Sequence, residues 1–283
     1  MSKQIPALSQ KQVIASFPKR PRDSHKGLFG TVAVIGGATG MIGAPLLAAR
    51  TALKLGAGCV HVGLLAENAP GVDMLQPELM LHSASAALRL PGVDVLAIGC
   101  GLGTSIAAQK LLYDALMCGS ALVIDADALN ILARQPDLQD DLRIRQAPSV
   151  LTPHPGEAAR LLDCDIKEIQ ADRVSAIRKL AQKFACSVVL KGAHSLCVTH
   201  GGRKYLNNTG NPGMSSAGMG DVLTGMIAAF IAQGMSADDA LLLAVHLHGA
   251  AGDTLAQQGI SVGLTASDVT EWARWLLNQW HRN

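Results

Sequence analysis

The sequence is poor in aromatic and in charged residues. Of its 283 residues, 3% are aromatic and 16% are charged, whereas 49% are hydrophobic and 29 are glycines. A core of small aliphatic side chains joined by many glycine turns is typical of layered α/β proteins. The formal net charge is +2 and no run of basic residues occurs, so the sequence lacks the electrostatic pattern of a nucleic-acid-binding protein.

Signs of secretion and of membrane insertion are also missing. The six cysteines form no Cys-x-x-Cys pair and most lie in apolar stretches, which favours buried free thiols in a reducing compartment. Residues 1–26 are polar and show no signal peptide. Residues 27–49 are uncharged, but their six glycines and one proline indicate a strand, a loop and a helix rather than a membrane span. We therefore expect a cytoplasmic protein.

Short apolar strands alternate with helical patterns through most of the sequence. The predicted strands are 31–35, 59–65, 78–82, 94–98, 121–124, 149–151 and 187–190. The predicted helices between them are 44–55, a segment ending near 117, a segment following Glu157, and 172–184. This alternation indicates a mostly parallel sheet with helices on both faces. No linker or repeat divides the sequence, so we expect one domain over residues 1–283, with residues 1–26 as a lead-in segment.

The last third of the sequence has a different pattern. Residues 196–199 and 203–206 flank a Gly-Gly pair and predict a β-hairpin. Two helices are predicted near the end, at 236–257 and at 266–280. Ser236 would cap the first of them together with Asp239.

A glycine-rich loop, residues 207–220, leads directly into an apolar helical pattern that contains Asp221 and ends near Gly234. The helix is predicted to begin between Gly218 and Gly220, where unpaired backbone amides form an anion site. A carboxylate there repels a phosphate unless it shares a metal ion with it or takes a proton from an attacking hydroxyl. Both interpretations indicate phosphoryl chemistry. The alternative is an ordinary capped helix after a flexible loop.

Polar and glycine-rich segments also follow several of the predicted strands. They are Gly36-Gly37, Gly99–Gly103, Asp125 with Asp127, His154, and Lys191–Ser195. Ligands bind beyond the carboxyl ends of parallel strands, so this set predicts a nucleotide-sized site. His154 lies between two prolines, which favours a ligand contact over a structural hydrogen bond, and Lys191 is expected beside phosphate or in a salt bridge. The spacing of His246 and His248 argues against a metal pair, and no P-loop motif occurs.

A set of motifs, taken in order, resembles the ribokinase-like superfamily and, within it, the standalone ADP-dependent NAD(P)H-hydrate dehydratases. They are His25-Lys-Gly-x-x-Gly30, Gly43-Ala-Pro-Leu-Leu-Ala-Ala49, Ile98-Gly-Cys-Gly-Leu-Gly103, Asp125-Ala-Asp-Ala-Leu-Asn130, Leu151-Thr-Pro-His-Pro-Gly-Glu157, Leu190-Lys-Gly-Ala-His-Ser195 and Asn211-Pro-Gly-Met-x5-Gly-Asp-Val-Leu-x-Gly225. The resemblance extends from about residue 25 to about residue 277. No single motif is decisive, but the ordered set is highly specific.

This resemblance implies a three-layer α/β/α sandwich around a mostly parallel sheet, and a hydro-lyase that repairs NADH and NADPH. Such an enzyme uses ADP or ATP, with Mg²⁺, to phosphorylate the hydroxyl group of the S-epimer of hydrated NADH or NADPH. Phosphate then leaves and the double bond of the ring returns. The resemblance also implies a homo-oligomer, by analogy a tetramer. Some relatives carry a fused epimerase domain, so we expect a separate epimerase to act in the same pathway.

The resemblance assigns roles to individual residues. Asp221 would be the general base on the substrate hydroxyl. The hydrated cofactor would contact Ala44, Gly101, Gly103, His154 and Asp221. The AMP part of ADP would contact Lys191, Gly192, Ala193, His194, Ser195 and Gly220. The backbone from Gly218 to Gly220 would meet the transferring phosphoryl group, and no residue is assigned to the metal ion.

Two residues depart from the family pattern. Met219 stands where threonine is common, which removes a hydroxyl but leaves the amides, and Cys100 stands where proline is common, which loosens that turn. A small-molecule kinase of the same fold, acting on a vitamin-precursor alcohol, is the nearest alternative. A catalytically silent nucleotide-binding scaffold is another, although the presence of Asp221 argues against it.

Overall fold

One nine-stranded sheet organises the computed structural model, which describes residues 5–282. The strands are β1 (Thr31–Gly36), β2 (Cys59–Leu64), β3 (Met80–Ser83), β4 (Val95–Ile98), β5 (Ala121–Ile124), β6 (Ser149–Leu151), β7 (Ser187–Leu190), β8 (Leu196–Val198) and β9 (Lys204–Leu206). Their order is β3-β2-β1-β4-β5-β6-β7-β8-β9. Pairs from β3 through β7 are parallel, and β8 and β9 join antiparallel. The predicted parallel sheet and its C-terminal hairpin are both confirmed.

Both faces of the sheet are buried. Val32 and Val34 of β1 pack into one hydrophobic cluster, whereas Ala33 and Ile35 pack into another. Successive side chains of a strand point to opposite faces, so a strand covered on both sides has no polar position. This explains why β4 and β5, and β1 from Val32 onward, appear in the sequence as unbroken apolar runs.

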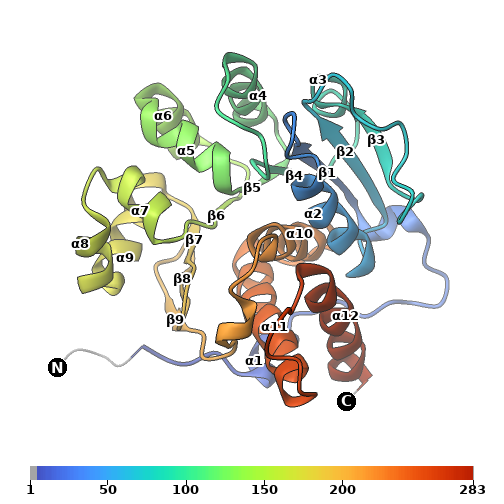
Figure 1. Ribbon diagram of the computed structural model, residues 1–283, viewed down its shortest axis with the longest axis vertical. Coiled ribbons are helices and arrows are strands. Elements are labelled where there is room, and N and C mark those ends of the chain that lie inside the picture. Colours follow the sequence, from blue (N-terminus) through green and yellow to red (C-terminus); the bar gives the residue numbers. More distant parts are fainter. Residues whose placement is uncertain (1–4, 283) are drawn as a thin grey trace.

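Helices form a layer on each face of the sheet (Figure 1). One face is covered by α2 (Gly43–Lys54), α10 (Met219–Ala232), α11 (Ala237–Gln257) and α12 (Ala266–Arg282). The other is covered by α3 (Ala84–Ala87), α4 (Ile106–Met117), α5 (Ala126–Arg134), α6 (Pro136–Ile144), α7 (Pro155–Leu162), α8 (Ile166–Ala171) and α9 (Arg173–Phe184). The architecture is therefore the expected three-layer α/β/α sandwich. Within residues 5–282, no helix is long and apolar enough to cross a bilayer.

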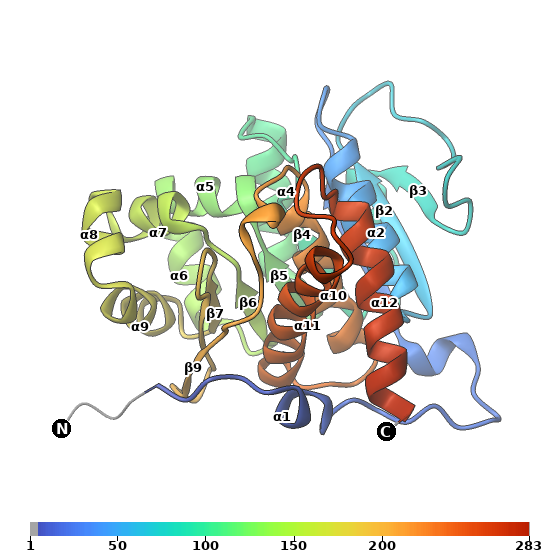
Figure 2. The ribbon, with the colours of Figure 1, turned by 60° about the horizontal axis from the view of Figure 1, so that its bottom comes forward.

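The segment before the first strand lies along one end of the sandwich (Figure 2). The Leu8 amide donates to the Leu206 carbonyl at 2.8 Å, which attaches this segment to β9. A short helix, α1 (Gln10–Ile14), then packs against α11, and a 3₁₀ turn, η1 (Lys26–Phe29), precedes β1. The part of the lead-in that the structure describes is therefore docked on the fold.

Four short helices have no counterpart among the predicted elements. They are α3, α5, α6 and α8, of four, nine, nine and six residues. Residues 125–130 were interpreted only as a polar segment after a strand, yet α5 begins immediately, with Ala126 in the left-handed region at φ +50°. The edge strand β3 lies at 80–83 rather than 78–82. Short helices carry little more than two turns of periodicity, which is too little to identify them.

The central helix α10 begins and ends where the sequence predicted. Gly218 is its N-cap, and Gly234 follows its C-cap residue with φ +93°. The helix is apolar on nearly all sides because it packs between the sheet, α2, α11 and α12. A Cβ atom added at Gly225 would lie 2.1 Å from the Ala48 carbonyl oxygen of α2. Glycine at this position therefore sets how closely the two helices approach.

We expect Gly225→Ala to destabilise the fold by about 1–3 kcal/mol, because the added methyl group forces two packed backbones apart. Urea unfolding monitored by circular dichroism measures this loss. Gly119→Ala is the matched control, since a Cβ atom at Gly119 would have no atom within 4 Å. Equal midpoints for the two variants would contradict the packing argument.

Candidate active site

The N-terminus of α10 leaves backbone amides free beside a carboxylate. Gly218 adopts φ +88°, a left-handed conformation that suits glycine, and no side chain caps the helix. The first amide bonded within the helix belongs to Val222 and donates to the Gly218 carbonyl at 3.0 Å. The amides before it therefore have no intrahelical partner, and with the helix dipole they favour an anion. Asp221 lies in the same first turn.

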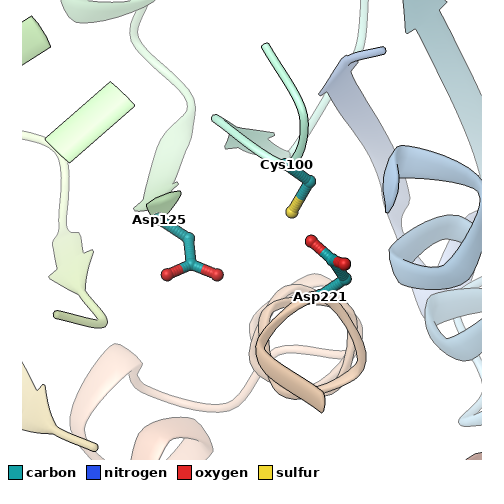
Figure 3. Close-up of side chains that lie close together, drawn as sticks. All are labelled: Cys100, Asp125 and Asp221. Atoms are coloured by element: carbon teal, nitrogen blue, oxygen red, sulfur yellow. The ribbon is translucent and has the colours of Figure 1, made fainter. Parts of the chain in front are cut away.

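Asp221 faces the ends of β4 and β5 (Figure 3). The Cys100 sulfur and carboxylate oxygens of Asp125 and Asp221 all lie within 4.8 Å of one another. Burial raises the pKa of Asp221 to about 6; the adjacent Cys100 thiol opposes this rise, and the negative charge of Asp125 adds to it. A carboxyl group with this pKa is ionised at neutral pH yet basic enough to accept a proton.

The raised pKa of Asp221 implies that the stability of the fold depends on pH. The pKa is about 6 in the folded chain, against an ordinary value of 3.8, so between these values the folded state binds more protons than the unfolded state. The contribution of this group to stability therefore falls as the pH rises through that interval. We expect the free energy of unfolding of Asp221→Asn, relative to wild type, to rise from about pH 4 to about pH 6 and then stay level. Urea unfolding at several pH values tests this; a difference that does not change with pH would contradict it.

A buried ion-pair network lies next to Asp221. The Lys191 ammonium donates to Asp125 Oδ1 at 2.7 Å, and the Thr224 hydroxyl donates to Asp125 Oδ2 at 3.0 Å. Burial raises the pKa of Asp125, but Lys191 and the hydroxyl donors outweigh it and hold the pKa below its usual value. Glu157 lies 3.8 Å from Lys191, and burial raises its pKa to about 7. Of the two environments predicted for Lys191, the structure contains the salt bridge.

A cavity of about 580 Å³ opens beside the start of α10. Its volume is within the range of small-molecule sites. Its wall includes six of the residues predicted to contact nucleotide: Lys191, Gly192, Ala193, His194, Ser195 and Gly220. The wall also includes Asn207, Asn208, Thr209, Gly210, Asn211, Pro212, Met214, Ser215, Met219, Leu223, Val245, His248 and Gly249. Gly218 is not a wall residue, but it caps the helix on which Met219 and Gly220 lie.

Two residues that shape this cavity were not predicted from the sequence. Asp253 of α11 accepts hydrogen bonds from the Gly210 amide at 2.8 Å and the Asn211 side chain at 3.0 Å, and so anchors the glycine-rich loop. His248 lines the cavity, and burial lowers its pKa to about 4, so its imidazole is neutral. His246, by contrast, contacts Asn207 at 3.3 Å, so the two histidines do point to different neighbours. Asp253 could be identified only from the structure, because α11 and the glycine-rich loop come together only in the folded chain.

Three of the predicted substrate-binding residues lie where the strand order reverses. β1 is followed in sequence by β2 on one side and is flanked by β4 on the other. Loops at such a switch point diverge and leave a crevice, which is where ligands bind in open α/β sheets. A Cβ atom at Gly101 would lie 3.2 Å from Ala44 Cβ, and the Gly103 amide donates to Asp127 at 2.8 Å. Since Cys100 precedes Gly101 and lies close to Asp221, this group adjoins Asp221.

His154 has a structural role that the sequence analysis considered the weaker alternative. It is the N-cap of α7, and its Nδ1 accepts from the Gly156 amide at 3.0 Å and the Glu157 amide at 3.3 Å. The Glu157 carboxylate accepts from the His154 amide at 2.7 Å, which completes a capping box. The side chain is nevertheless 49% exposed. Its predicted contact with substrate stays a prediction.

The donor set beside Asp221 does not fit a Mg²⁺ ion held by protein ligands. Mg²⁺ requires an octahedron of oxygen atoms and keeps several waters. Here the group of Cys100, Asp125 and Asp221 offers a thiol, and Asp125 already accepts from Lys191 and Thr224. We therefore assign no residue as a metal ligand.

Comparisons with known proteins identify the family. Residues 32–273 match the NAD(P)H-hydrate dehydratase family. The chain is 42% identical over 267 residues to the ADP-dependent (S)-NAD(P)H-hydrate dehydratase of Neisseria meningitidis, covering 93% of this chain and 90% of that protein. It is 42% identical over 275 residues to the bifunctional NAD(P)H-hydrate repair enzyme of Coxiella burnetii, of which it spans 55%.

A solved structure shows the same fold. The ADP/ATP-dependent NAD(P)H-hydrate dehydratase of Bacillus subtilis, co-crystallised with ATP and Mg²⁺, superposes with a TM-score of 0.89 at 29% identity, covering 99% of this chain and all of the other. The fold, the order of the motifs and the family match over most of the sequence therefore lead to one conclusion: the chain belongs to the NAD(P)H-hydrate dehydratase family and has the ribokinase-like fold.

Proposed function

We propose that this chain is a hydro-lyase that uses ADP to dehydrate the S-epimer of hydrated NADH or NADPH, restoring NADH or NADPH. The observation that carries the proposal is Asp221, a carboxylate with a pKa of about 6 in the first turn of α10, beside free amides and next to a 580 Å³ cavity. This arrangement occurs in a chain that is 42% identical over most of its length to a dehydratase of that specificity.

The first chemical step is phosphoryl transfer. Asp221 takes the proton from the hydroxyl group of the hydrated nicotinamide ring while the hydroxyl oxygen attacks the terminal phosphorus of ADP. A new P–O bond forms, the bond to the bridging oxygen breaks, and AMP leaves with that electron pair. The amides of Gly218, Met219 and Gly220 donate hydrogen bonds to the transferring phosphoryl group, and their dipoles are already oriented before the reaction.

The second step is elimination. Phosphate leaves the ring with the electron pair of the C–O bond, a proton is lost from the adjacent carbon, and the ring double bond returns. The products are the reduced dinucleotide, AMP and phosphate. Phosphate is a much better leaving group than hydroxide, which explains why a dehydration consumes nucleotide.

The cavity supplies the nucleotide site. Lys191 to Ser195 and Gly220 would hold the AMP part of ADP, with the diphosphate directed to the start of α10. The Lys191 ammonium lies at this border, since a Cβ atom at Gly220 would be 3.2 Å from it. Its positive charge therefore faces the position that the phosphates would occupy. Mg²⁺ would accompany the nucleotide through its phosphates and water, supplying charge neutralisation without protein ligands.

We place the substrate at the strand switch point, where ligands bind in open α/β sheets. Ala44, Gly101 and Gly103 would face the hydrated cofactor, and the half-exposed ring of His154 would contact it as well. The left-handed φ values of +58° at Gly101 and +71° at Gly103 favour glycine, which leaves backbone rather than side chain at these two positions.

The test is incubation of the purified full chain with the hydrated NADH S-epimer and ADP, ATP or no nucleotide. We expect the absorbance of reduced nicotinamide to return only when a nucleotide is present, with one AMP formed per NADH in the ADP reaction. Nucleotide consumption with a phosphorylated product and no return of absorbance would instead indicate a kinase. The comparison of ADP with ATP, and of the NADH with the NADPH hydrate, establishes the preferred pair.

The proposal also covers the oligomeric state, the cellular compartment and a partner enzyme. We expect a homotetramer in the cytoplasm, formed by chains that each fold as one domain over residues 1–283. Met74 and Leu75, which are 83% and 78% exposed near the edge strand β3, offer an apolar surface for a second copy, and six free cysteines suit a reducing compartment. A separate epimerase would interconvert the two substrate epimers, which fits the existence of bifunctional relatives about twice as long. Light scattering after gel filtration measures the subunit number.

A further inference from the structure

We propose that Cys100 is a positioning residue that donates a hydrogen bond from its thiol to Asp221 and keeps that carboxylate oriented and ionised for catalysis. The inference rests on the proposed role of Asp221 as general base. It concerns a side chain for which the family resemblance assigned no role.

The backbone of Cys100 is held in place from two sides. Its carbonyl oxygen accepts from the Gly37 amide at 3.2 Å, and a Cβ atom at Gly36 would lie 2.0 Å from that oxygen. On the other side, a Cβ atom at Gly99 would lie 1.9 Å from the Asp125 carbonyl oxygen. Cys100 is 0% exposed. Two close approaches that only glycine permits therefore fix the position of the thiol, which points toward Asp221 (Figure 3).

The charged groups around Asp221 leave the thiol as its hydrogen-bond donor. The groups that face Asp221 are Asp125 at the end of β5, Asp127 at the start of α5, Lys191 at the end of β7, and Cys100 itself. The Lys191 ammonium is paired with Asp125 Oδ1 at 2.7 Å. The negative charges of Asp125 and Asp127 repel that of Asp221. Burial and the nearby carboxylates raise the pKa of Cys100 well above its usual value. The sulfur therefore keeps its proton and acts as a donor.

A thiol is a weak donor, and this suits a general base. A hydrogen bond to the charged form of a carboxylate lowers its pKa, and a strong donor would make it a poor base. The thiol offsets only part of the effect of burial, so the pKa of Asp221 remains at about 6.

The experiment is the pH dependence of kcat/KM, with the full chain and saturating ADP, for wild type, Cys100→Ala and Cys100→Ser. Alanine removes the donor, so we expect the acid limb to move to higher pH by about half a unit or more, roughly a threefold loss on that limb. Serine provides a stronger donor, so the limb should move to lower pH. Cys197→Ala, a buried cysteine in β8, is the matched control and should leave the limb unchanged.

A purely structural role for Cys100 would lower the rate equally at every pH in both variants, and that result would overturn the inference. Should Cys100→Ala fail to fold, the serine variant gives the same test, and an unmoved limb would overturn the inference. NMR titration of ¹³C-labelled aspartate carboxyl groups reports the pKa of Asp221 without any turnover. Activity retained by Asp221→Asn would instead refute the proposed function, whatever Cys100 does.

Discussion

Asp221→Asn is expected to lower kcat on the order of 10²-fold or more, because an amide cannot accept the proton of the attacking hydroxyl. The loss of kcat should appear at every pH. Nucleotide binding should change little, since the residues that line the 580 Å³ cavity do not include Asp221. The NADH-hydrate assay measures the rate, and isothermal titration with ADP measures binding.

Unfolding of the Asp221→Asn variant is not expected to explain its lower kcat. Asp221 carries its charge at a buried position that raises its pKa, so replacement by a neutral isostere should leave stability at neutral pH equal or higher. Asp114→Asn is the matched control, because that aspartate forms an exposed pair with Lys110 on α4 and faces no part of the site. A kcat for Asp221→Asn close to that of the control would remove Asp221 from the chemistry.

Asp125→Ala is expected to cost about 3–5 kcal/mol of stability, because it leaves the Lys191 ammonium buried without its main partner. Asp125 is 1% exposed and accepts from both Lys191 and Thr224, so the substitution also leaves a buried hydroxyl without its acceptor. Glu157, at 3.8 Å from Lys191, is too distant for a good hydrogen bond and compensates only in part. Urea unfolding monitored by circular dichroism measures the loss.

A double-mutant cycle measures the interaction energy between Asp125 and Lys191. Adding Lys191→Met to Asp125→Ala removes the unpaired charge and should recover most of the lost stability, while nucleotide binding stays impaired. Asp114→Ala breaks an exposed ion pair and should cost only about 1 kcal/mol or less. The desolvation argument fails if Asp125→Ala costs no more than Asp114→Ala.

Much of the fold was predictable from local patterns. The strands β1, β4, β5 and β7 are apolar runs bounded by glycine and polar residues, and α10 begins within the predicted range because Gly218 suits φ +88°. The helix start at Ser236 was also predictable, since its hydroxyl accepts from the Asp239 amide at 3.1 Å. These features depend on residues within a few positions of one another, so the sequence displays them directly.

The candidate site was only partly predictable. The motif resemblance identified Lys191 to Ser195 and Gly220, which the structure gathers around one cavity, and placed Asp221 beside them. It did not identify Asp253, which anchors the loop from a helix 42 positions away, or the neutral His248 in the wall. Neither residue carries a local signal, because an acid or a histidine on an Ala/Leu-rich helix is equally compatible with a solvent-facing position.

Short-range spacing and the order of motifs are enough to predict a mostly parallel sheet, a helix start between Gly218 and Gly220, and the family. Only the folded chain brings the Lys191 ammonium to Asp125, 66 positions away, and the Cys100 thiol close to Asp221. The physical reason is the order of the strands. Side chains at the ends of β4, β5 and β7 come together only because those strands assemble in one sheet beneath α10, and no local pattern states which strands are neighbours.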